Sequence, residues 1–210
     1  AERFMQEADE WRFLEFFESW NPINFMDEDW EEVKKDENTY KSLAIKCLKK
    51  SYNIIKSDDK QTGSNEWLIE IYQVATSKFP KDEWINREKA LLLIQNNNLA
   101  QAIEIYKNLV LSLGDKAYIW SEFSGCFENN NDLKIGMLSK AILLEKNEDF
   151  LGDIHLHLTE ALIGNDLIEN AIIELSKYKK HREKKGWKLS ETYTALNSKI
   201  SDNQTSLKNN

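Results

Sequence analysis

Glycine, proline and cysteine are scarce in this sequence, and each scarcity excludes a class of protein. Seven glycines and two prolines in 210 residues are too few for an all-β sandwich, which needs a turn about every ten residues. The two cysteines, Cys47 and Cys126, form no CxxC pair and match no metal-ligand spacing, so we expect both to be small buried hydrophobic residues in a reducing cytoplasm. No apolar run approaches the roughly 18 residues that span a bilayer, and residues 1–20 are acidic and amphipathic, unlike a signal peptide. Helical structure in a protein without membrane segments is favoured.

Motifs for catalysis and metal binding are also missing. The sequence contains no GxSxG, HExxH, GxxxxGK[ST] or GxGxxG, the patterns of common hydrolase, metalloprotease and nucleotide sites. His155 and His157 are two residues apart, so on a helix they project about 200° from each other and cannot chelate one ion. The acidic run 27–32 lacks the turn glycine of a calcium loop. We therefore expect no enzyme activity, no cofactor and no metal, although side chains distant in sequence can still form a site.

The negative charge is concentrated at one end of the chain. Residues 1–38 contain 13 Asp or Glu and 4 Lys or Arg, a balance of −9, whereas the remaining residues carry 23 acidic and 24 basic side chains, a balance of +1. The net charge of −8 disfavours non-specific binding of nucleic acid by the whole molecule.

A polar turn followed by an amphipathic segment occurs three times in the second half of the sequence. The segments are residues 97–111, 129–143 and 164–178. The leucines Leu99, Leu133 and Leu167 are evenly spaced in them, at intervals of about 34 residues, a length typical of helical repeats. Asn and Asp favour turns and helix ends because their side chains compete for backbone hydrogen bonds. The pattern predicts a repeat of helix, turn and helix.

A period of about 34 residues made of two helices resembles the tetratricopeptide repeat (TPR) family. The residues that carry the resemblance are Ala90 and Leu93 on one helix A, Trp120, Phe123, Ser124 and Phe127 on the next, Ala102, Tyr106 and Leu109 on a helix B, and Pro80 at the end of a repeat. Gly136 and Asn170 at the small helix B position, and Lys140 and Glu174 at its aromatic position, depart from the family pattern. Ala171 lies next to the expected small position, so a shift of the third repeat by one residue is an open alternative.

The resemblance implies an all-α fold, a right-handed superhelical solenoid of antiparallel helix pairs. The expected organisation is an N-terminal helical cap (1–38), a degenerate helix pair (39–82), three repeats (83–116, 117–150 and 151–185), a capping helix (186–200) and a disordered tail (201–210). The cap is aromatic-rich: Phe4, Trp11, Leu14 and Phe17 form a broad apolar face, and Asn21 with Pro22 is expected to start a short acidic helix carrying Trp30 and Val33. We expect the apolar face to pack on the solenoid. The alternative is a docking surface for a partner, including a second copy of the chain.

The family usually binds peptides on the concave surface formed by its A helices. Carried over by position, the resemblance predicts that seven residues line this groove: Trp84, Arg87, Tyr118, Ser121, Glu128, His155 and Thr159. The positions where some relatives hold a carboxylate clamp of Lys and Asn are occupied by Arg87 with Leu91 and Ser121 with Gly125, so no such clamp is evident.

A second candidate surface is the basic segment 177–185. Its cations are Lys177, Lys179, Lys180, Arg182, Lys184 and Lys185. They could bind phosphates or an acidic peptide, stabilise the end of a helix through its dipole, or contact the acidic N-terminal segment. The sequence thus predicts a cytoplasmic, non-catalytic scaffold that binds a protein or peptide in the helix A groove, with a nucleic-acid accessory module as the alternative.

Overall fold

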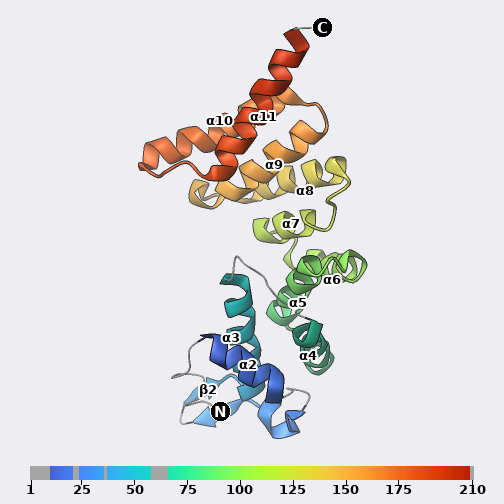
Figure 1. The fold of residues 1–210 in the computed structure, drawn as a ribbon. Helices are drawn as coiled ribbons and strands as arrows, with labels where there is room; N and C mark the ends of the chain where they lie inside the picture. Colours follow the sequence, from blue (N-terminus) through green and yellow to red (C-terminus); the bar gives the residue numbers. More distant parts are fainter. Residues whose placement is uncertain (1–9, 21–23, 36, 58–65, 209–210) are drawn as a thin grey trace. The chain divides into compact units, whose positions relative to one another are not determined.

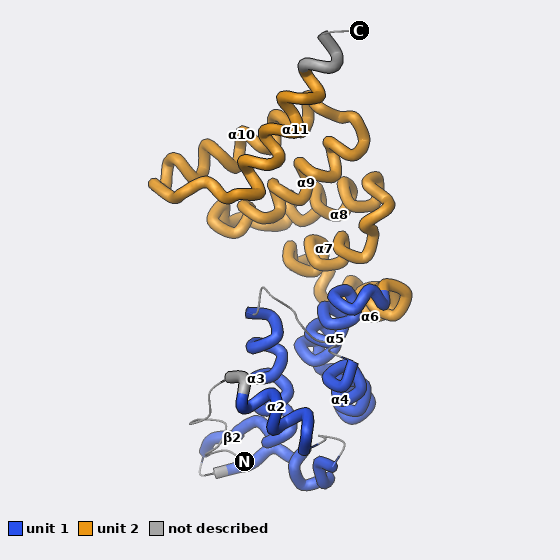
Figure 2. Tube along the Cα trace, viewed as in Figure 1, with its two compact units in different colours: residues 1–98 blue, residues 99–210 orange. Residues whose placement is uncertain are grey.

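The structure, a computed structural model, describes residues 10–20, 24–35, 37–57 and 66–208. The chain divides into two compact units, residues 1–98 and residues 99–210 (Figure 2). Secondary structure within the described ranges is α-helical apart from two 3₁₀ turns and one small hairpin, so the all-α prediction is confirmed. None of the helices in these ranges is both long and apolar enough to cross a bilayer.

Unit 1 builds its core from helices and the aromatic N-terminal segment. Its elements are α2 (Glu10–Trp20), η2 (Asp27–Trp30), β1 (Val33–Lys35), β2 (Asn38–Tyr40), α3 (Leu43–Ser57), α4 (Glu66–Lys78) and α5 (Glu83–Gln95). Helix α2 packs on α3, α3 on α4, and α4 on α5. A single apolar cluster joins them, with Leu48, Leu68 and Tyr72 among its fully buried members. Residues 39–82 thus contain two helices, α3 and α4, that pack on each other.

The apolar face of α2 is covered within unit 1. Phe13 and Phe17 are each only 1% exposed, and the Phe17 ring meets the edge of Trp67 on α4 at a centroid distance of 5.9 Å. Such edge-to-face pairs add to the free energy gained from burial. Phe4 and the side chain of Trp11 lie outside the described residues. A partner is not needed to cover Phe13 and Phe17, which supports the role of α2 as a cap.

The segment after α2 differs from the predicted short acidic helix. Within the described part of this segment a 3₁₀ turn forms at Asp27–Trp30, and the chain then pairs β1 with β2 in antiparallel register, Val33 opposite Tyr40. Val33 and Tyr40 are β-branched and aromatic, the types that favour strands. Trp30 is buried and anchors the turn. Asn21 and Pro22 lie outside the described residues.

Unit 2 is a series of helices that pack on their neighbours (Figure 1). They are α6 (Leu99–Leu113), α7 (Ala117–Ser124), α8 (Asn131–Leu144), the 3₁₀ turn η3 (Glu148–Phe150), α9 (Gly152–Gly164), α10 (Ile168–Lys185) and α11 (Glu191–Lys208). Leu138, Ala141, Leu158, Ala171 and Leu175 belong to its apolar cluster and are almost inaccessible to solvent. Helices from α7 onward therefore share one continuous core, as stacked repeats do.

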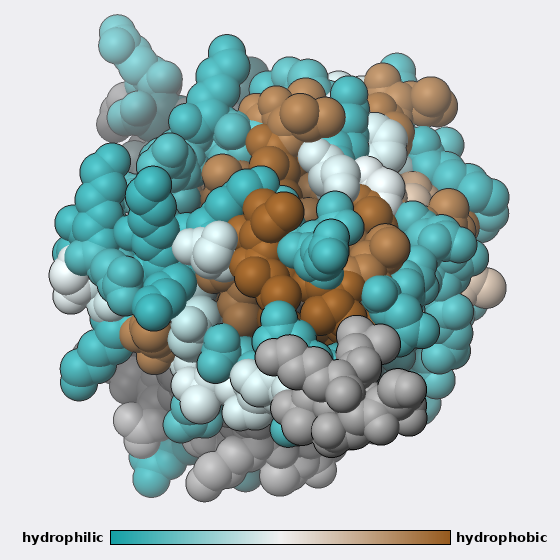
Figure 3. Space-filling view, turned by 90° about the horizontal axis from the view of Figure 1, so that it is seen from above, coloured by the Kyte–Doolittle hydropathy of each residue, from teal (hydrophilic) through white to brown (hydrophobic). Residues whose placement is uncertain are grey.

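Helix α11 covers the end of this series. It packs on both α9 and α10, burying Leu196 and Ile200 and stacking Tyr193 on Tyr178. A capping helix was predicted for residues 186–200, but α11 runs to Lys208, so the expectation of a disordered tail from residue 201 was wrong. A packed first half nucleates the helix, and extending it costs little. Figure 3 shows that an apolar area ringed by hydrophilic residues remains on the face viewed from above.

The turns after α5 and α9 end these two A helices by the same geometry, whereas α7 ends at Gly125 in the right-handed region. Asn97 and Asp166 have positive φ angles, 56° and 57°. The next amide in each case donates to a carbonyl five residues back, Asn98 to Leu93 at 2.8 Å and Leu167 to Leu162 at 2.9 Å. This is the Schellman arrangement, which Asn and Asp tolerate better than most residues. The turn role predicted for these residues is confirmed.

The helices keep the predicted period only on average. The A helices α5, α7 and α9 begin at Glu83, Ala117 and Gly152, so the second interval is one residue longer than the first. Among the B helices, α6 begins at Leu99. If the predicted period were kept strictly, the next two B helices would begin at Leu133 and Leu167. Helix α8 begins two residues before the first of these positions, and α10 begins one residue after the second.

The shift of the third repeat is confirmed by burial. Ala102, Tyr106 and Leu109 of α6 are buried, and their buried counterparts in α10 are Ala171, Leu175 and Tyr178. Each counterpart lies one residue beyond two full periods. The small helix B position is therefore Ala171, and the assignment of Asn170 to it was wrong. Gly136 is exposed, so its assignment to the small position in α8 was wrong too.

Candidate functional site

A pocket in unit 2 lies between the A helices α7 and α9. It has a volume of about 430 Å³, within the range of small-molecule and side-chain pockets. We call it the α7–α9 pocket and define it by its lining: Ala117, Tyr118, Ser121 and Glu122 of α7, Glu145, Phe150 of η3, and Asp153 and Ile154 of α9. Phe150 is 68% exposed, so an aromatic ring is available at its edge. Charged lining residues are all acidic.

Two of the seven predicted groove residues line this pocket, namely Tyr118 and Ser121. Glu128 is exposed in the turn that follows α7 and is not part of the lining. Trp84 and Arg87 lie on α5 in unit 1, where the Arg87 guanidinium sits 5.3 Å from the centre of the half-exposed Trp84 ring. The predicted set is thus distributed over several places.

The register shift explains where the other two predicted groove residues lie. Thr159 is fully buried, and its hydroxyl donates to the carbonyl of His155 at 2.8 Å. Thr159 occupies the small buried position that Ala90 and Ser124 occupy in the preceding A helices. It lies one residue later in the sequence than the regular repeat interval would place it. Thr159 therefore does not face a groove, and its assignment was wrong. His155 is only 7% exposed and turns toward α10.

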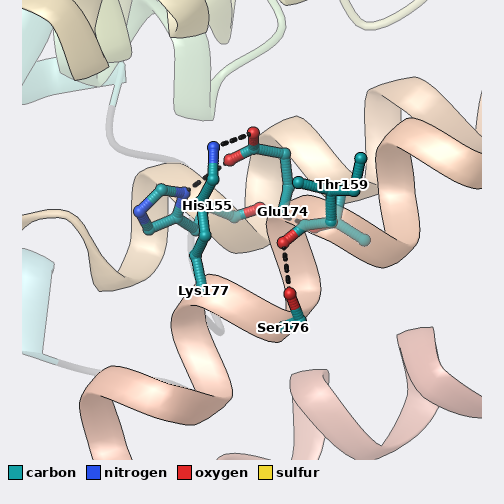
Figure 4. A network of polar contacts seen from close by, with 6 residues as sticks. His155, Thr159, Glu174, Ser176 and Lys177 are labelled. Carbon is teal, nitrogen blue, oxygen red and sulfur yellow. Dashed lines mark hydrogen bonds and ion pairs between the residues drawn. The ribbon is translucent and has the colours of Figure 1, made fainter.

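His155, Glu174 and Lys177 form a polar network between α9 and α10 (Figure 4). The Nδ1 atom of His155 lies 2.8 Å from Oε2 of Glu174, and Lys177 Nζ donates to the other carboxylate oxygen at 2.6 Å. Burial by itself would raise the pKa of Glu174, but these two hydrogen bonds and the positive charge of Lys177 outweigh it and lower the pKa. The network holds an ionised carboxylate between the last two repeat helices.

The basic segment 177–185 forms the second half of α10, and most of its cations are engaged within the fold. Arg182 donates Nε to the carbonyl of Lys188 at 2.9 Å and lies 5.2 Å from the centre of the Trp187 ring. Lys185 binds Asp149 at 2.9 Å, which lowers the pKa of that carboxyl. Lys179 lies 3.7 Å from Glu183. With Lys177 bound to Glu174, four of the six cations of this segment are engaged in contacts within unit 2.

A second pocket, which we call the α10 pocket, opens beside this segment. It also measures about 430 Å³. Three lysines from successive turns of α10, Lys177, Lys180 and Lys184, line it together with His155 and His181. Glu148 of η3 is its one acidic lining residue, and Ile142, Leu151 and Tyr178 supply apolar surface. The two pockets lie on either side of η3, because Glu148 lines one and Phe150 the other.

Sequence reasoning missed the residues of η3 and their partner His181. The His181 ring is largely shielded, with its nitrogens 3.4 Å from Glu148 Oε2 and 3.0 Å from Asp149 Oδ1. Residues 145–150 follow the end of α8 and match no known sequence motif. Only their position between two A helices could have indicated a site there. No group of three metal-ligating side chains occurs among the residues that the structure describes.

Unit 1 has a separate buried polar pair. The Tyr72 hydroxyl donates to Glu88 Oε2 at 2.8 Å, and Glu88 is only 8% exposed. Burial raises the pKa of Glu88, and the hydrogen bond from Tyr72 and the charges of Lys49 and Arg87 oppose this without reversing it. Burial likewise raises the pKa of Tyr72. The pair lies in the core and lines neither pocket.

Comparison with known proteins places most of the chain in one family. The family model described as "Domain of unknown function (DUF7017)" matches residues 83–210, more than half of the sequence. The chain belongs to the DUF7017 family. No curated protein sequence matches it.

Solved structures with TPR-like repeats match the fold of this DUF7017 protein. "MamA RS-1 ArsTM double mutant" is similar with a TM-score of 0.61 and 12% identity, over 88% of this chain and 91% of that one. "MamA AMB-1 P212121" gives a TM-score of 0.59 and 12% identity, over 87% and 96%. These likenesses confirm a TPR-like helical repeat fold. At this identity they say nothing of a partner.

Proposed function

We propose that this DUF7017 protein is a non-catalytic scaffold of the cytoplasm that binds a peptide segment of a partner protein in the α7–α9 pocket. The observation that carries the proposal is the pocket itself, which opens between consecutive A helices and contains Tyr118 and Ser121, two residues singled out from the repeat pattern. The choice of a peptide ligand follows the expectation, drawn from the TPR resemblance of the sequence, that the A helices form a peptide-binding groove. Cys47 and Cys126 are buried and form no disulfide among the described residues, which fits a reducing compartment.

The lining of the α7–α9 pocket indicates the chemistry of the peptide. Phe150 and Tyr118 offer aromatic surface for an apolar side chain, and aromatic anchors usually dominate binding energy. Glu145 and Asp153 also line this pocket, and its lining contains no basic residue. We therefore expect the preferred segment to place an apolar side chain next to Lys or Arg.

Selection of peptides on the immobilised full chain tests this proposal. Peptides from a displayed library are synthesised with a fluorescent label, and their dissociation constants are measured by anisotropy. The double variant Tyr118→Ala/Phe150→Ala is expected to weaken binding at least about tenfold, since two aromatic contacts are lost.

A matched control removes apolar side chains of similar size elsewhere in unit 2. Leu111 and Leu143 are 85% and 81% exposed and line neither pocket, so Leu111→Ala/Leu143→Ala is expected to change the dissociation constant less than about twofold. Equal binding by both double variants would show that the selected peptides bind elsewhere and would refute the assignment.

A further inference from the structure

The α10 pocket contains positive charges that the fold does not neutralise. Lys177 is paired with Glu174 at 2.6 Å, and His181 faces Asp149 and Glu148. Lys180 and Lys184, in contrast, make no ion pair or hydrogen bond within the part of the chain that the structure describes. Both are exposed. Two lysine charges at this pocket are therefore available to an external anion.

The geometry of α10 places these two lysines side by side. Residues four apart on a helix lie on one face with Cβ atoms about 5–6 Å apart, so Lys180 and Lys184 present a pair of ammonium groups along the pocket. In an extended peptide, alternate side chains point to the same side and are about 6.6 Å apart. Two carboxylates separated by one residue match the spacing of the lysine pair.

We propose that the α10 pocket binds an acidic peptide segment of a partner protein, with alternate carboxylates on Lys180 and Lys184 and an apolar side chain against Leu151 and Tyr178. The site is formed by α10 together with η3, Ile142 of α8 and His155 of α9, and it shares no lining residue with the α7–α9 pocket. It therefore does not depend on the proposed function.

The surroundings of the pocket favour a short acidic peptide over nucleic acid. Nucleic-acid sites follow the phosphate backbone with a continuous positive track. Here Glu148 lines the pocket and Asp149 adjoins His181, so neighbouring phosphates of a strand would meet carboxylates. The apolar lining by Ile142, Leu151 and Tyr178 instead offers burial to a hydrophobic side chain.

Fluorescence anisotropy with the full chain tests the proposal. The probe is a labelled peptide, Gly-Ser-Glu-Ser-Glu-Ser-Leu-Gly, whose two glutamates and leucine fall on one face when it is extended. We expect it to bind at low ionic strength and the same peptide with glutamine in place of glutamate to bind at least about tenfold more weakly, because two ion pairs are lost.

Charge reversal with a matched control locates the binding. Lys180→Glu/Lys184→Glu is expected to abolish binding, whereas Lys140→Glu/Lys199→Glu, which changes the net charge equally at exposed positions outside both pockets, leaves it within about twofold. If the reversed variant loses its helical circular dichroism, Lys180→Gln/Lys184→Gln replaces it. The wild type failing to bind the probe, or both double variants losing it equally, would overturn the proposal.

Competition distinguishes the alternative ligands. Inorganic phosphate or a single-stranded oligonucleotide displacing the probe at a lower concentration than the unlabelled glutamate peptide would show a phosphate site and overturn the assignment. Tyr118→Ala/Phe150→Ala is expected to bind the probe as the wild type does, because neither residue lines the α10 pocket. This result would separate the α10 pocket from the α7–α9 pocket.

Discussion

We expect the replacement of two glycines of unit 2, Gly136 and Gly186, by alanine to change the free energy of unfolding in opposite directions. Gly136 lies in the interior of α8, and a Cβ built on it meets no atom within 4 Å. Gly186 ends α10 with φ of 69°, and a Cβ there also meets open space. Neither substitution creates a clash or a new contact, so each reports on the backbone alone.

The magnitudes follow from that isolation. In a helix interior, alanine is favoured over glycine by about 1 kcal/mol because glycine loses more backbone entropy on folding, so Gly136→Ala should raise the free energy of unfolding by about that amount. Placing a residue with a Cβ in the left-handed region costs about 1–2 kcal/mol. Gly186→Ala should lower the free energy by that amount and weaken the bond from the Trp187 amide to the Arg182 carbonyl, now 2.9 Å.

Urea unfolding followed by circular dichroism at 222 nm measures both changes. The two variants are expected to differ from each other by roughly 2–3 kcal/mol, with thermal midpoints several degrees to either side of the wild type. Destabilisation by Gly136→Ala would show that this face of α8 is packed against something and would refute the burial assignment. A neutral Gly186→Ala would show that α10 does not end in a left-handed residue.

We expect the buried carboxyl group of Glu88 and the partly buried one of Glu174 to give opposite pH dependences of stability. Because burial raises the pKa of Glu88, its ionisation destabilises unit 1 as pH rises above about 4.5, so Glu88→Gln should be more stable than wild type at pH 7 by roughly 1 kcal/mol, measured by urea unfolding. Wild-type stability equal to the variant's at all pH values would contradict this. For Glu174, whose pKa is lowered, stability is present above about 4.5 and lost as pH falls through the folded value. Glu174→Gln should therefore cost about 1–3 kcal/mol at pH 7 and nearly nothing in strong acid; an equal cost at both pH values would exclude an ionised Glu174.

The architecture was predictable from the sequence because it depends on features that repeat. Apolar spacing and Asn-rich turns act locally, and Asn97 and Asp166 adopt the left-handed conformation that such turns require. Those signals located most helices, and the TPR resemblance supplied their packing. The hairpin at Val33 was missed because a few β-branched and aromatic residues weigh little against an acidic, helix-like composition.

The candidate site was less predictable because a site depends on register. When the groove positions of the TPR family were transferred to this sequence at a fixed spacing, Thr159 was assigned to the groove. The third repeat is shifted by one residue, and the side chain of Thr159 lies in the core. On a helix, one residue is a rotation of about 100°, which exchanges an accessible position for a buried one. Tyr118 and Ser121 were predicted to line the groove and line the α7–α9 pocket, since α7 begins one regular period after α5.

Both pockets adjoin the place where the repeat is irregular. The interval between the starts of α7 and α9 is one residue longer than that between α5 and α7, and the connection before α9 folds into η3. That single turn directs Phe150 to the α7–α9 pocket and Glu148 to the α10 pocket, and Asp149 ties it to α10 through Lys185. A strictly periodic chain would present the same surface at every repeat. Here one extra residue makes the third repeat different from the others, with an acidic aromatic pocket on one side of η3 and a basic pocket on the other. Departures from local regularity tend to mark functional sites, and at η3 residues adjacent in sequence line an acidic pocket and a basic pocket.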